Sequence, residues 1–269
     1  MDYSVLMSVY YKENPKYFKE SIKSILSQSV PTCDFVIVCD GPLTDELYNV
    51  LDEYKENPVI NVVKLSENQG LAKALAEGLR HCKCELVARM DSDDIAEPFR
   101  CEEQLLAFET EDLDVVGSNV VEFIDRPENI RTERCVPETH DDIREYSKKR
   151  NPMNHPSVMF KKASVIACGS YQEFHLYEDY QLWVNMIMSG YKFKNIQKPL
   201  VKMRTTNDLY MRRGGFGYFK SGYKFQNYMY KCGHISFVRY LKNISELLIV
   251  HALMPNYIRK WFYLKILRK

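Results

Sequence analysis

The segment ELVARMDSDD, residues 85–94, decides the fold and raises the question of function. An apolar run typical of a buried strand passes directly into Asp91, Asp93 and Asp94. Residues i and i+2 of an extended chain point to the same side, so Asp91 and Asp93 face one way. Paired carboxylates suit a hard cation such as Mg²⁺ or Mn²⁺, which also binds substrate phosphates. The alternative is a helix N-cap, which explains one aspartate, and we expect Asp94 to start the next helix.

Three more apolar runs precede this segment, and helical patterns separate them. The runs are YSVLMSVYY (3–11), DFVIVCDGP (34–42) and INVVKL (60–65). The spacing of Leu71, Leu75 and Leu79 predicts the apolar face of a helix. Continuous apolar strands that alternate with helices are typical of an α/β fold with a parallel, doubly wound sheet.

The second half of the chain has a less regular pattern. We expect a helix in EEQLLAFE (102–109), a long strand in DVVGSNVVEFI (114–124), and a loop with a short helix over 125–150. HPSVMF (155–160) is strand-like. YEDYQLWVNMIMSG (177–190) predicts an amphipathic helix that ends at Gly190. VKMRTTNDLYMRRGGFG (201–217) predicts a strand and a Gly-rich basic loop, and the chain from Tyr218 onward is helical, aromatic and basic.

Charge divides the chain more clearly than composition does. The 269 residues carry a net charge of +1, but residues 1–191 hold 20 Lys/Arg against 34 Asp/Glu, and residues 192–269 hold 17 against 2. We predict a main domain over 1–215 and a basic aromatic helical segment over 216–269. Such asymmetry indicates an anionic partner, either nucleic acid or a membrane surface.

The final stretch, MPNYIRKWFYLKILRK (254–269), mixes bulky apolar and basic residues, as interfacial helices on anionic lipid do. The alternative is a helix packed on the domain with a solvated basic face. No apolar stretch reaches the roughly 18 residues of a membrane span, and no signal peptide is recognised. The eight scattered cysteines lack a CxxC pair, which argues against zinc and for reduced thiols in a cytosolic protein.

Polar residues stand where three of the predicted strands end. Asp40 ends the second strand, Asn68 to Lys73 follow the third, and Asp91 and Asp93 end the fourth. Ligands of open parallel sheets bind at these carboxyl ends, so we expect the three stations to converge. Asp40 has the alternative of capping the turn at Gly41.

Three other motifs are candidates for chemistry. Glu178 and Asp179 begin a predicted helix, where a carboxylate serves either as a general base or as a partner of the helix dipole. Arg212 and Arg213 precede two glycines and would either fold over a phosphate or form a solvated loop. His155 stands alone, and a lone histidine is more often structural.

Taken together, these segments resemble the inverting family 2 glycosyltransferases of the GT-A fold. The resemblance covers about residues 3–205 and rests on segments in the family's order: the opening strand and helix, FVIVCDGPLTDEL, LSENQGLAKALAEGL, ARMDSDDI as the Asp-x-Asp motif and YEDYQLW as the Glu-Asp motif. It implies a Rossmann-like, mostly parallel sheet flanked by helices. It also implies a bacterial enzyme of capsule, exopolysaccharide or O-antigen biosynthesis.

The resemblance also implies a role for each candidate residue. Asp179 would be the general base, with Glu178 beside it for acceptor or donor contacts. The nucleotide-sugar, with UDP expected, would meet Asp40 at its uracil, Asp91 at ribose and sugar, and Asn68 and Lys73 near the nucleotide. Asp93 would ligate Mn²⁺ or Mg²⁺, Arg212 and Arg213 would cover the diphosphate, and His155 would lie on the acceptor side.

The sequence departs from the family pattern in places. The Gln-x-x-Arg-Trp motif of processive synthases is absent, which favours the addition of one sugar. A histidine that serves some relatives as a metal ligand is not evident near 204–208, where Asn207 or Asp208 would replace it. The expected acceptor is a lipid-linked saccharide and the expected location is cytoplasmic, peripheral at the anionic inner leaflet, without nucleic acid. The alternatives are a Mg²⁺-dependent sugar nucleotidyltransferase, although SVYYKENP is no Gly-rich phosphate loop, and a non-catalytic nucleotide- or anionic-polymer-binding protein.

Overall fold

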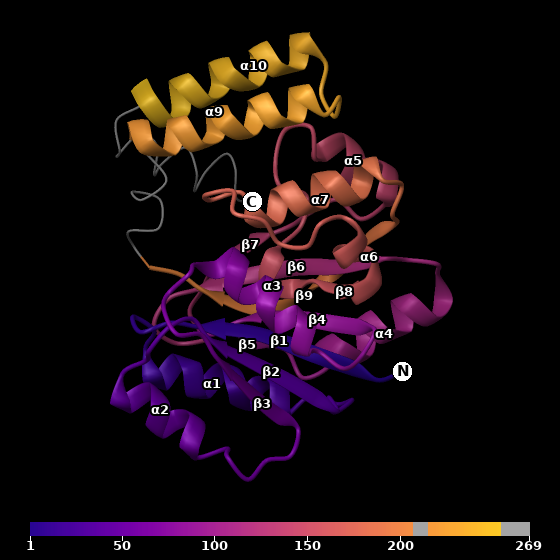
Figure 1. Ribbon diagram of the computed structural model, residues 1–269. Coiled ribbons are helices and arrows are strands. Elements are labelled where there is room, and N and C mark those ends of the chain that lie inside the picture. The colour runs from indigo at the N-terminus through magenta and orange to yellow at the C-terminus, as the bar shows by residue number, and fades with distance from the viewer. Residues whose placement is uncertain (207–214, 254–269) are drawn as a thin grey trace.

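The computed structural model, shown in Figure 1, describes residues 1–206 and 215–253. Its centre is a nine-stranded sheet in the order β3-β2-β1-β4-β8-β6-β9-β5, with β7 paired to β6. Helices cover both faces, and a helical hairpin lies at one end of the molecule. The predicted α/β class, with its sheet flanked by helices and a helical C-terminal segment, is confirmed.

The first four strands form the parallel half that the sequence predicts. They are β1 (Tyr3–Val9), β2 (Asp34–Cys39), β3 (Ile60–Lys64) and β4 (Leu86–Asp91). Strand β1 lies between β2 and β4 in parallel register, with Val9 opposite Cys39 and Ser8 opposite Asp91. Both faces of β1, β2 and β4 are buried, which explains their continuous apolar runs. This register brings Asp40 and Asp91 to the same edge of the sheet.

Helices cover the parallel strands from two sides. Helix α1 (Pro15–Leu26) begins after Asn14, whose side chain accepts a hydrogen bond from the Lys16 N–H. With α2 (Asp45–Asp52) and α4 (Arg100–Thr110), it packs on one face of the sheet. Helix α3 (Leu71–His81) packs on the other face through Leu75 and Leu79. Leu71 is 41% exposed, so the predicted apolar face begins one turn later.

The second half of the sheet is mixed in direction. It consists of β5 (Ile95–Ala96), β6 (Val115–Phe123), β7 (Ile130–Arg134), β8 (Met159–Lys161) and β9 (Phe193–Arg204). Strands β6 and β9 are parallel, whereas β8 runs antiparallel to both β4 and β6. The strand predicted in HPSVMF is shorter than expected, because His155–Ser157 form a 3-10 turn, η1.

Three short or medium helices connect these strands. They are α5 (His140–Tyr146), α6 (Lys162–Ala167) and α7 (Glu178–Met188). Helix α7 is the amphipathic helix that the sequence predicts: it buries Leu182, Trp183, Met186 and Ile187, and Gly190 follows it with a positive φ of 85°. The segment 125–150 contains the expected short helix, but also strand β7, which the prediction missed.

The carboxyl-terminal hairpin consists of α9 (Phe216–Lys231), α10 (Phe237–Leu247) and the π-helical η2 (Leu248–Leu253). Figure 1 shows α9 nearer to α7 and α10 as the outer helix. Phe225 and Met229 of α9 share a small core with Tyr180 and Val184 of α7. The division at residue 215 stays a prediction, although this core joins α9 to the preceding part of the chain. Among the described residues, no helix is long and apolar enough to cross a membrane.

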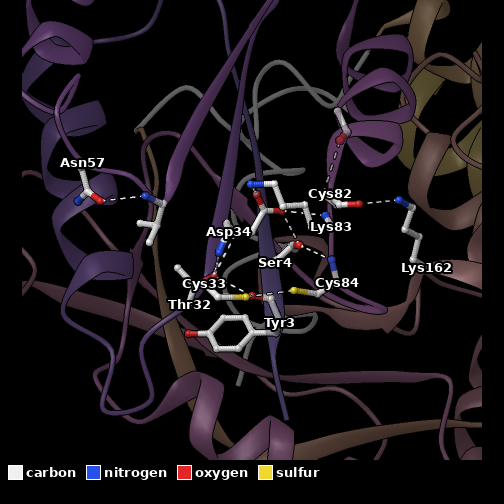
Figure 2. A network of polar contacts seen from close by, with 12 residues as sticks. Tyr3, Ser4, Thr32, Cys33, Asp34, Asn57, Cys82, Lys83, Cys84 and Lys162 are labelled. Carbon is white, nitrogen blue, oxygen red and sulfur yellow. Dashed lines mark hydrogen bonds and ion pairs between the residues drawn. The ribbon is translucent and has the colours of Figure 1, made fainter.

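Polar contacts close the amino-terminal edge of the parallel strands, as Figure 2 shows. The Ser4 hydroxyl donates to Asp34 Oδ2 at 2.7 Å and accepts from the Cys84 N–H at 3.0 Å. Asp34 Oδ2 also accepts from the Lys83 N–H at 2.9 Å. The sulfur atoms of Cys33 and Cys84 lie 3.2 Å apart, and the cysteines are free thiols. These side chains hold the strands together at their amino-terminal ends. Ligands of such sheets bind at the carboxyl ends of the strands, so the site is expected there.

Candidate active site

Three aspartates meet where β4 ends. Carboxylate oxygens of Asp91, Asp93 and Asp94 all lie within 4.8 Å of one another. The side chain of Asp91 is 35% exposed, whereas that of Asp94 is almost fully buried. Oδ2 of Asp94 has no hydrogen-bond partner within the described residues. Clustered oxygens with an unpaired buried member fit a hard divalent cation, so the chemistry of the donor set agrees with Mg²⁺ or Mn²⁺.

The electrostatics of the cluster also fit a site for a divalent cation. Burial, then the charges of Asp91 and Glu13, raise the pKa of Asp93 to about 7. The pKa of Asp94 is raised well above its usual value by burial and by Asp93. Crowded carboxylates that repel one another are stabilised as anions when a cation enters.

The expectation that Asp94 starts a helix is wrong. Asp94 leads into β5, and its Oδ1 accepts a hydrogen bond from the Arg204 N–H of β9 at 2.7 Å. Helix α4 begins later, after Phe99, without a side-chain cap. The pairing of β5 with β9 turns the Asp94 carboxylate inward, toward Asp91 and Asp93.

Arg204 holds the loop of the acidic cluster in place, and nothing in the sequence indicated this role. Its Nε donates to the Asp93 carbonyl oxygen at 3.0 Å, and its Nη2 pairs with Glu20 at 2.6 Å. The guanidinium carbon lies 3.7 Å from the Tyr17 ring centroid and 4.6 Å from that of Phe123. Arg204 thus fixes the loop after β4 through its backbone. Its separation of 111 residues from Asp93 left no local signal.

Asp40 organises the turn that leads into α3. Its carboxylate accepts from the Gln69 N–H at 2.7 Å and the Gly70 N–H at 3.0 Å, and its carbonyl accepts from Asn68 Nδ2 at 3.1 Å. Asp40 and Asn68 therefore come together as predicted, but the Asp40 side chain is 3% exposed and already holds two N–H groups. Its contact with a nucleotide base stays a prediction. Lys73 lies further along α3, half exposed, with Nζ 3.2 Å from Glu173.

Gly41 allows this turn, and its replacement by alanine is expected to disturb it. The φ of Gly41 is +82°, and an added Cβ would lie 2.5 Å from the Asn68 nitrogen. We expect Gly41→Ala to lower the free energy of unfolding by about 1–3 kcal/mol and to raise the KM for the donor. Gly217→Ala is the matched control, because its Cβ would enter open space. Chemical denaturation measures both, and equal stabilities would contradict this role of Gly41.

The Glu178-Asp179 motif begins α7. Asp179 Oδ2 accepts a hydrogen bond from Asn151 Nδ2 at 2.6 Å. Burial raises the pKa of Asp179, while Asn151 opposes that rise. Burial also raises the pKa of Glu178, whose Oε1 accepts from the Leu176 N–H at 3.3 Å. A partly buried carboxylate with an elevated pKa is a stronger base than an exposed one. Asn151 is a second residue that the sequence did not reveal.

His155 lies in an aromatic setting under the site. Its Nε2 is 3.0 Å from the Tyr171 hydroxyl, and its ring is 6.2 Å from that of Trp183. Burial and the nearby Arg89 charge hold the pKa of His155 well below its usual value, so the ring is neutral. Its place on the acceptor side stays a prediction. Arg212, Arg213, Asn207, Asp208 and the stretch 254–269 lie outside the described residues.

The comparisons with known proteins agree on one family. Residues 4–180 match the Glycosyl transferase family 2 domain. The chain is 37% identical to the UDP-Gal:alpha-D-GlcNAc-diphosphoundecaprenol beta-1,3-galactosyltransferase of Escherichia coli, over 99% of this chain and 97% of that protein. It is 38% identical to the amylovoran biosynthesis glycosyltransferase AmsE of Erwinia amylovora, over 81% of this chain and 82% of that protein.

Solved structures show the same fold at low sequence identity. The structure of Staphylococcus aureus TarS 1–349 in complex with UDP-GlcNAc has a TM-score of 0.67 and 17% identity, over 92% of this chain and 72% of that one. The mannosyltransferase PcManGT of Pyrobaculum calidifontis, in complex with GDP-Man and Mn²⁺, has a TM-score of 0.57 and 17% identity, over 98% and 70% of the two chains.

The mixed sheet flanked by helices, with acidic residues at one edge, is the GT-A fold of glycosyltransferases. Within that class, the chain belongs to glycosyl transferase family 2, whose members invert the anomeric configuration. It is therefore an enzyme, and neither a nucleotidyltransferase nor a non-catalytic binding protein. The predicted resemblance is confirmed.

Proposed function

We propose that this enzyme transfers one sugar from a UDP-sugar to a hydroxyl group of a lipid-linked saccharide during synthesis of a bacterial surface polysaccharide. The observation that carries the proposal is the convergence of Asp91, Asp93 and Asp94 where β4 ends. The E. coli relative supports the substrates, because its name specifies UDP-Gal and a diphosphoundecaprenol-linked GlcNAc.

The acidic cluster would serve the departure of the nucleotide. Asp93 would ligate the metal, with Asp94 as the inner member of the cluster and Asp91 turned to ribose and sugar. Mn²⁺ or Mg²⁺, when bound, supplies positive charge that stabilises the diphosphate leaving group. Arg204 would keep the loop of these ligands fixed through its contacts to Asp93 and Asp94. Arg212 and Arg213 would cover the diphosphate, as the family resemblance implies.

Asp179 would act at the acceptor. It would accept the proton of the acceptor hydroxyl while that oxygen attacks the anomeric carbon from the face opposite the nucleotide. A single displacement of this kind inverts the configuration, so an α-linked donor gives a β-linked product. Asn151 would orient the carboxylate by holding Oδ2. Asp40, Asn68 and Lys73 would line the nucleotide side, with Glu178 and His155 toward the acceptor.

A donor screen tests this function. Purified enzyme is incubated with UDP-galactose, UDP-glucose, UDP-N-acetylhexosamines or dTDP-rhamnose and a synthetic GlcNAc-diphospho-lipid, with Mn²⁺, with Mg²⁺ or with EDTA. We expect one UDP-sugar to give a single-sugar product with inverted configuration, and EDTA to abolish it. Turnover of dTDP-rhamnose alone would contradict the UDP part of the proposal, and full activity in EDTA would contradict the metal part.

The same proposal includes attachment to an anionic membrane surface through α10. One arc of this helix and of η2 is apolar and 41–76% exposed, and consists of Phe237, Val238, Leu241, Leu248 and Ile249. Residues 216–253 contain one acid, Glu246, and their exposed bases include Lys220, Lys224, Lys231 and Lys242. An outward apolar arc beside lysines fits an anionic bilayer, where a lipid-linked acceptor resides.

Acidic substitutions on this arc are expected to weaken membrane binding. We expect the double variant Val238→Glu/Leu241→Glu to lower the partition onto phosphatidylglycerol-containing vesicles by about 10-fold or more, because two apolar contacts become anionic. Co-sedimentation measures this. Leu106→Glu/Ile166→Glu is the control, since these residues are also apolar and about half exposed, at 54% and 49%, but lie on α4 and α6. Unchanged vesicle binding of the α10 variant would contradict the assignment of α10 as the membrane-binding surface. Turnover of a water-soluble acceptor by the same variant shows whether catalysis is retained.

A further inference from the structure

Within residues 1–206 and 215–253, Arg89 and Arg100 are the two fully buried arginines, and they differ in how their N–H groups are satisfied. Arg100 donates to Gln104 Oε1 at 3.1 Å, to the Arg89 carbonyl oxygen at 2.6 Å and to the Val158 carbonyl oxygen at 3.3 Å. Arg89 is 2% exposed and bonds to Asp91 through Nη2. Its Nε and Nη1 atoms are buried and have no hydrogen-bond partner within the part of the chain that the structure describes.

Such an arginine is costly to the fold. A buried cation loses its hydration, and one ion pair with two unpaired donors compensates for only part of that loss. Arg100, which α4 carries on the opposite face of the sheet, shows that this protein can satisfy a buried arginine with amide and carbonyl oxygens. The incomplete pairing of Arg89 therefore indicates a requirement for its charge at this place rather than for stability alone.

The location of Arg89 connects the two acidic motifs. It stands two residues before Asp91 on β4, on the face of the sheet that α3 and α7 cover. On one side its Nη2 pairs with Asp91, whose carboxylate lies within 4.8 Å of those of Asp93 and Asp94. On the other side, α7 packs on this same face and begins with Glu178 and Asp179, and the Arg89 charge opposes part of the rise that burial gives the pKa of Asp179. Tyr171 and Trp183, whose rings lie beside that of His155, belong to the core on this face.

We infer that Arg89 is a positioning residue that fixes the Asp91 carboxylate through Nη2 and supplies one buried positive charge shared by the donor-side aspartates and the Asp179 base. The inference rests on the proposed function, because it takes Asp179 as the base. Arg89 lies too deep to touch substrate itself. It acts through the carboxylates, one of which meets the nucleotide-sugar while the other meets the acceptor.

The other groups around Asp179 do not replace this charge. Asn151 donates to Oδ2 but is neutral, and Glu178 is an acid. Tyr171 and Tyr180 face Asp179 as un-ionised phenols, because burial raises the pKa of both. Arg134 is the second cation, and it also lowers the pKa of Asp179. Without Arg89, the Asp179 carboxylate would remain buried. Of the two described cations that lower its pKa, only Arg134 would be left.

The test compares Arg89→Met, Arg89→Lys and Arg100→Met in the full chain. In Arg89→Met we expect kcat to fall about 10- to 100-fold, as for residues that orient a catalytic group. The acid limb of the kcat profile is expected to move to higher pH, because Asp179 holds its proton more tightly when the cation is lost. In Arg89→Lys the charge remains but the planar fork is lost, so we expect the acid limb to stay and the donor KM to rise.

Arg100→Met is the matched control for loss of a buried arginine. It is expected to lower Tm without moving the acid limb, because the described contacts of Arg100 are to Gln104, Met90 and backbone carbonyls. A folded Arg89→Met enzyme with the wild-type acid limb and KM would overturn the inference. If Arg89→Met does not fold, Arg89→Lys decides, and unchanged KM and kcat in that variant would overturn it. Failure of Asp179→Asn to impair turnover would instead refute the proposed base.

Discussion

Asp93→Ala is expected to abolish metal-dependent turnover, with a loss of at least about 100-fold. The oxygens of Asp91, Asp93 and Asp94 lie within 4.8 Å of one another, and Asp93 is the central member in sequence. Removal of one of three clustered carboxylates leaves a site with too few oxygen ligands and less negative charge. Mutation of residues that only orient metal ligands already lowers metal affinity or activity about 10- to 100-fold. Product formation over a Mn²⁺ titration measures the effect.

The control for Asp93→Ala is Asp112→Ala, which removes a carboxylate from a side chain that is 97% exposed in the loop between α4 and β6. This variant should retain wild-type turnover and the wild-type dependence on Mn²⁺. Excess metal is expected to restore little activity to Asp93→Ala. An Asp93→Ala enzyme that saturates at the same Mn²⁺ concentration as the wild type would refute the assignment of Asp93 as a ligand.

Asp179→Asn is expected to lower kcat about 10²- to 10⁴-fold and to leave donor binding nearly intact. An amide of the same shape fills the site but accepts no proton. Burial raises the pKa of Asp179, so wild-type activity should rise with pH as this carboxyl loses its proton, and this limb should disappear in the variant. Steady-state kinetics with donor titration separates kcat from binding.

Glu178→Gln serves as the neighbouring comparison for Asp179→Asn. Glu178 Oε1 accepts from the Leu176 N–H and is oriented differently from Asp179, which Asn151 holds. We therefore expect a smaller loss of kcat and a retained acid limb. Near-normal turnover in Asp179→Asn, or a larger loss in Glu178→Gln, would reverse the roles of the two acids.

The sequence predicts best those elements whose burial produces a local pattern of apolar residues. The parallel strands β1, β2 and β4 are buried on both faces, and their continuous apolar runs reveal them. Strand β7 was missed because its residues are exposed or half-buried and three of its five side chains are charged. Leu71 fits the helical period of α3 but precedes the first turn that packs on the sheet, so period alone places it wrongly.

The candidate site follows the same rule. The spacing of Asp91 and Asp93 is local, so their grouping was predictable. The place of Asp94 depends on the pairing of β5 with β9, which joins residues about a hundred positions apart. Arg89 lies within the quoted segment, but no feature of the local pattern distinguishes it from the buried residues around it. Asn151 and Arg204 reach Asp179 and Asp93 through tertiary contacts, and no short motif announces such contacts.

The stack of Tyr177 on Phe225 bears on how such enzymes can be recombined. The two rings lie 4.7 Å apart and nearly parallel, and Tyr177 immediately precedes the Glu178-Asp179 motif. Tyr180, one residue beyond the motif, lies 4.5 Å from the same phenylalanine. A chimera that takes its hairpin from another family member would thus alter the packing that supports Glu178 and Asp179, the acids proposed to act at the acceptor. On the proposed assignment, donor preference is better exchanged at the loops after β2 and β4, with α7 and α9 inherited together.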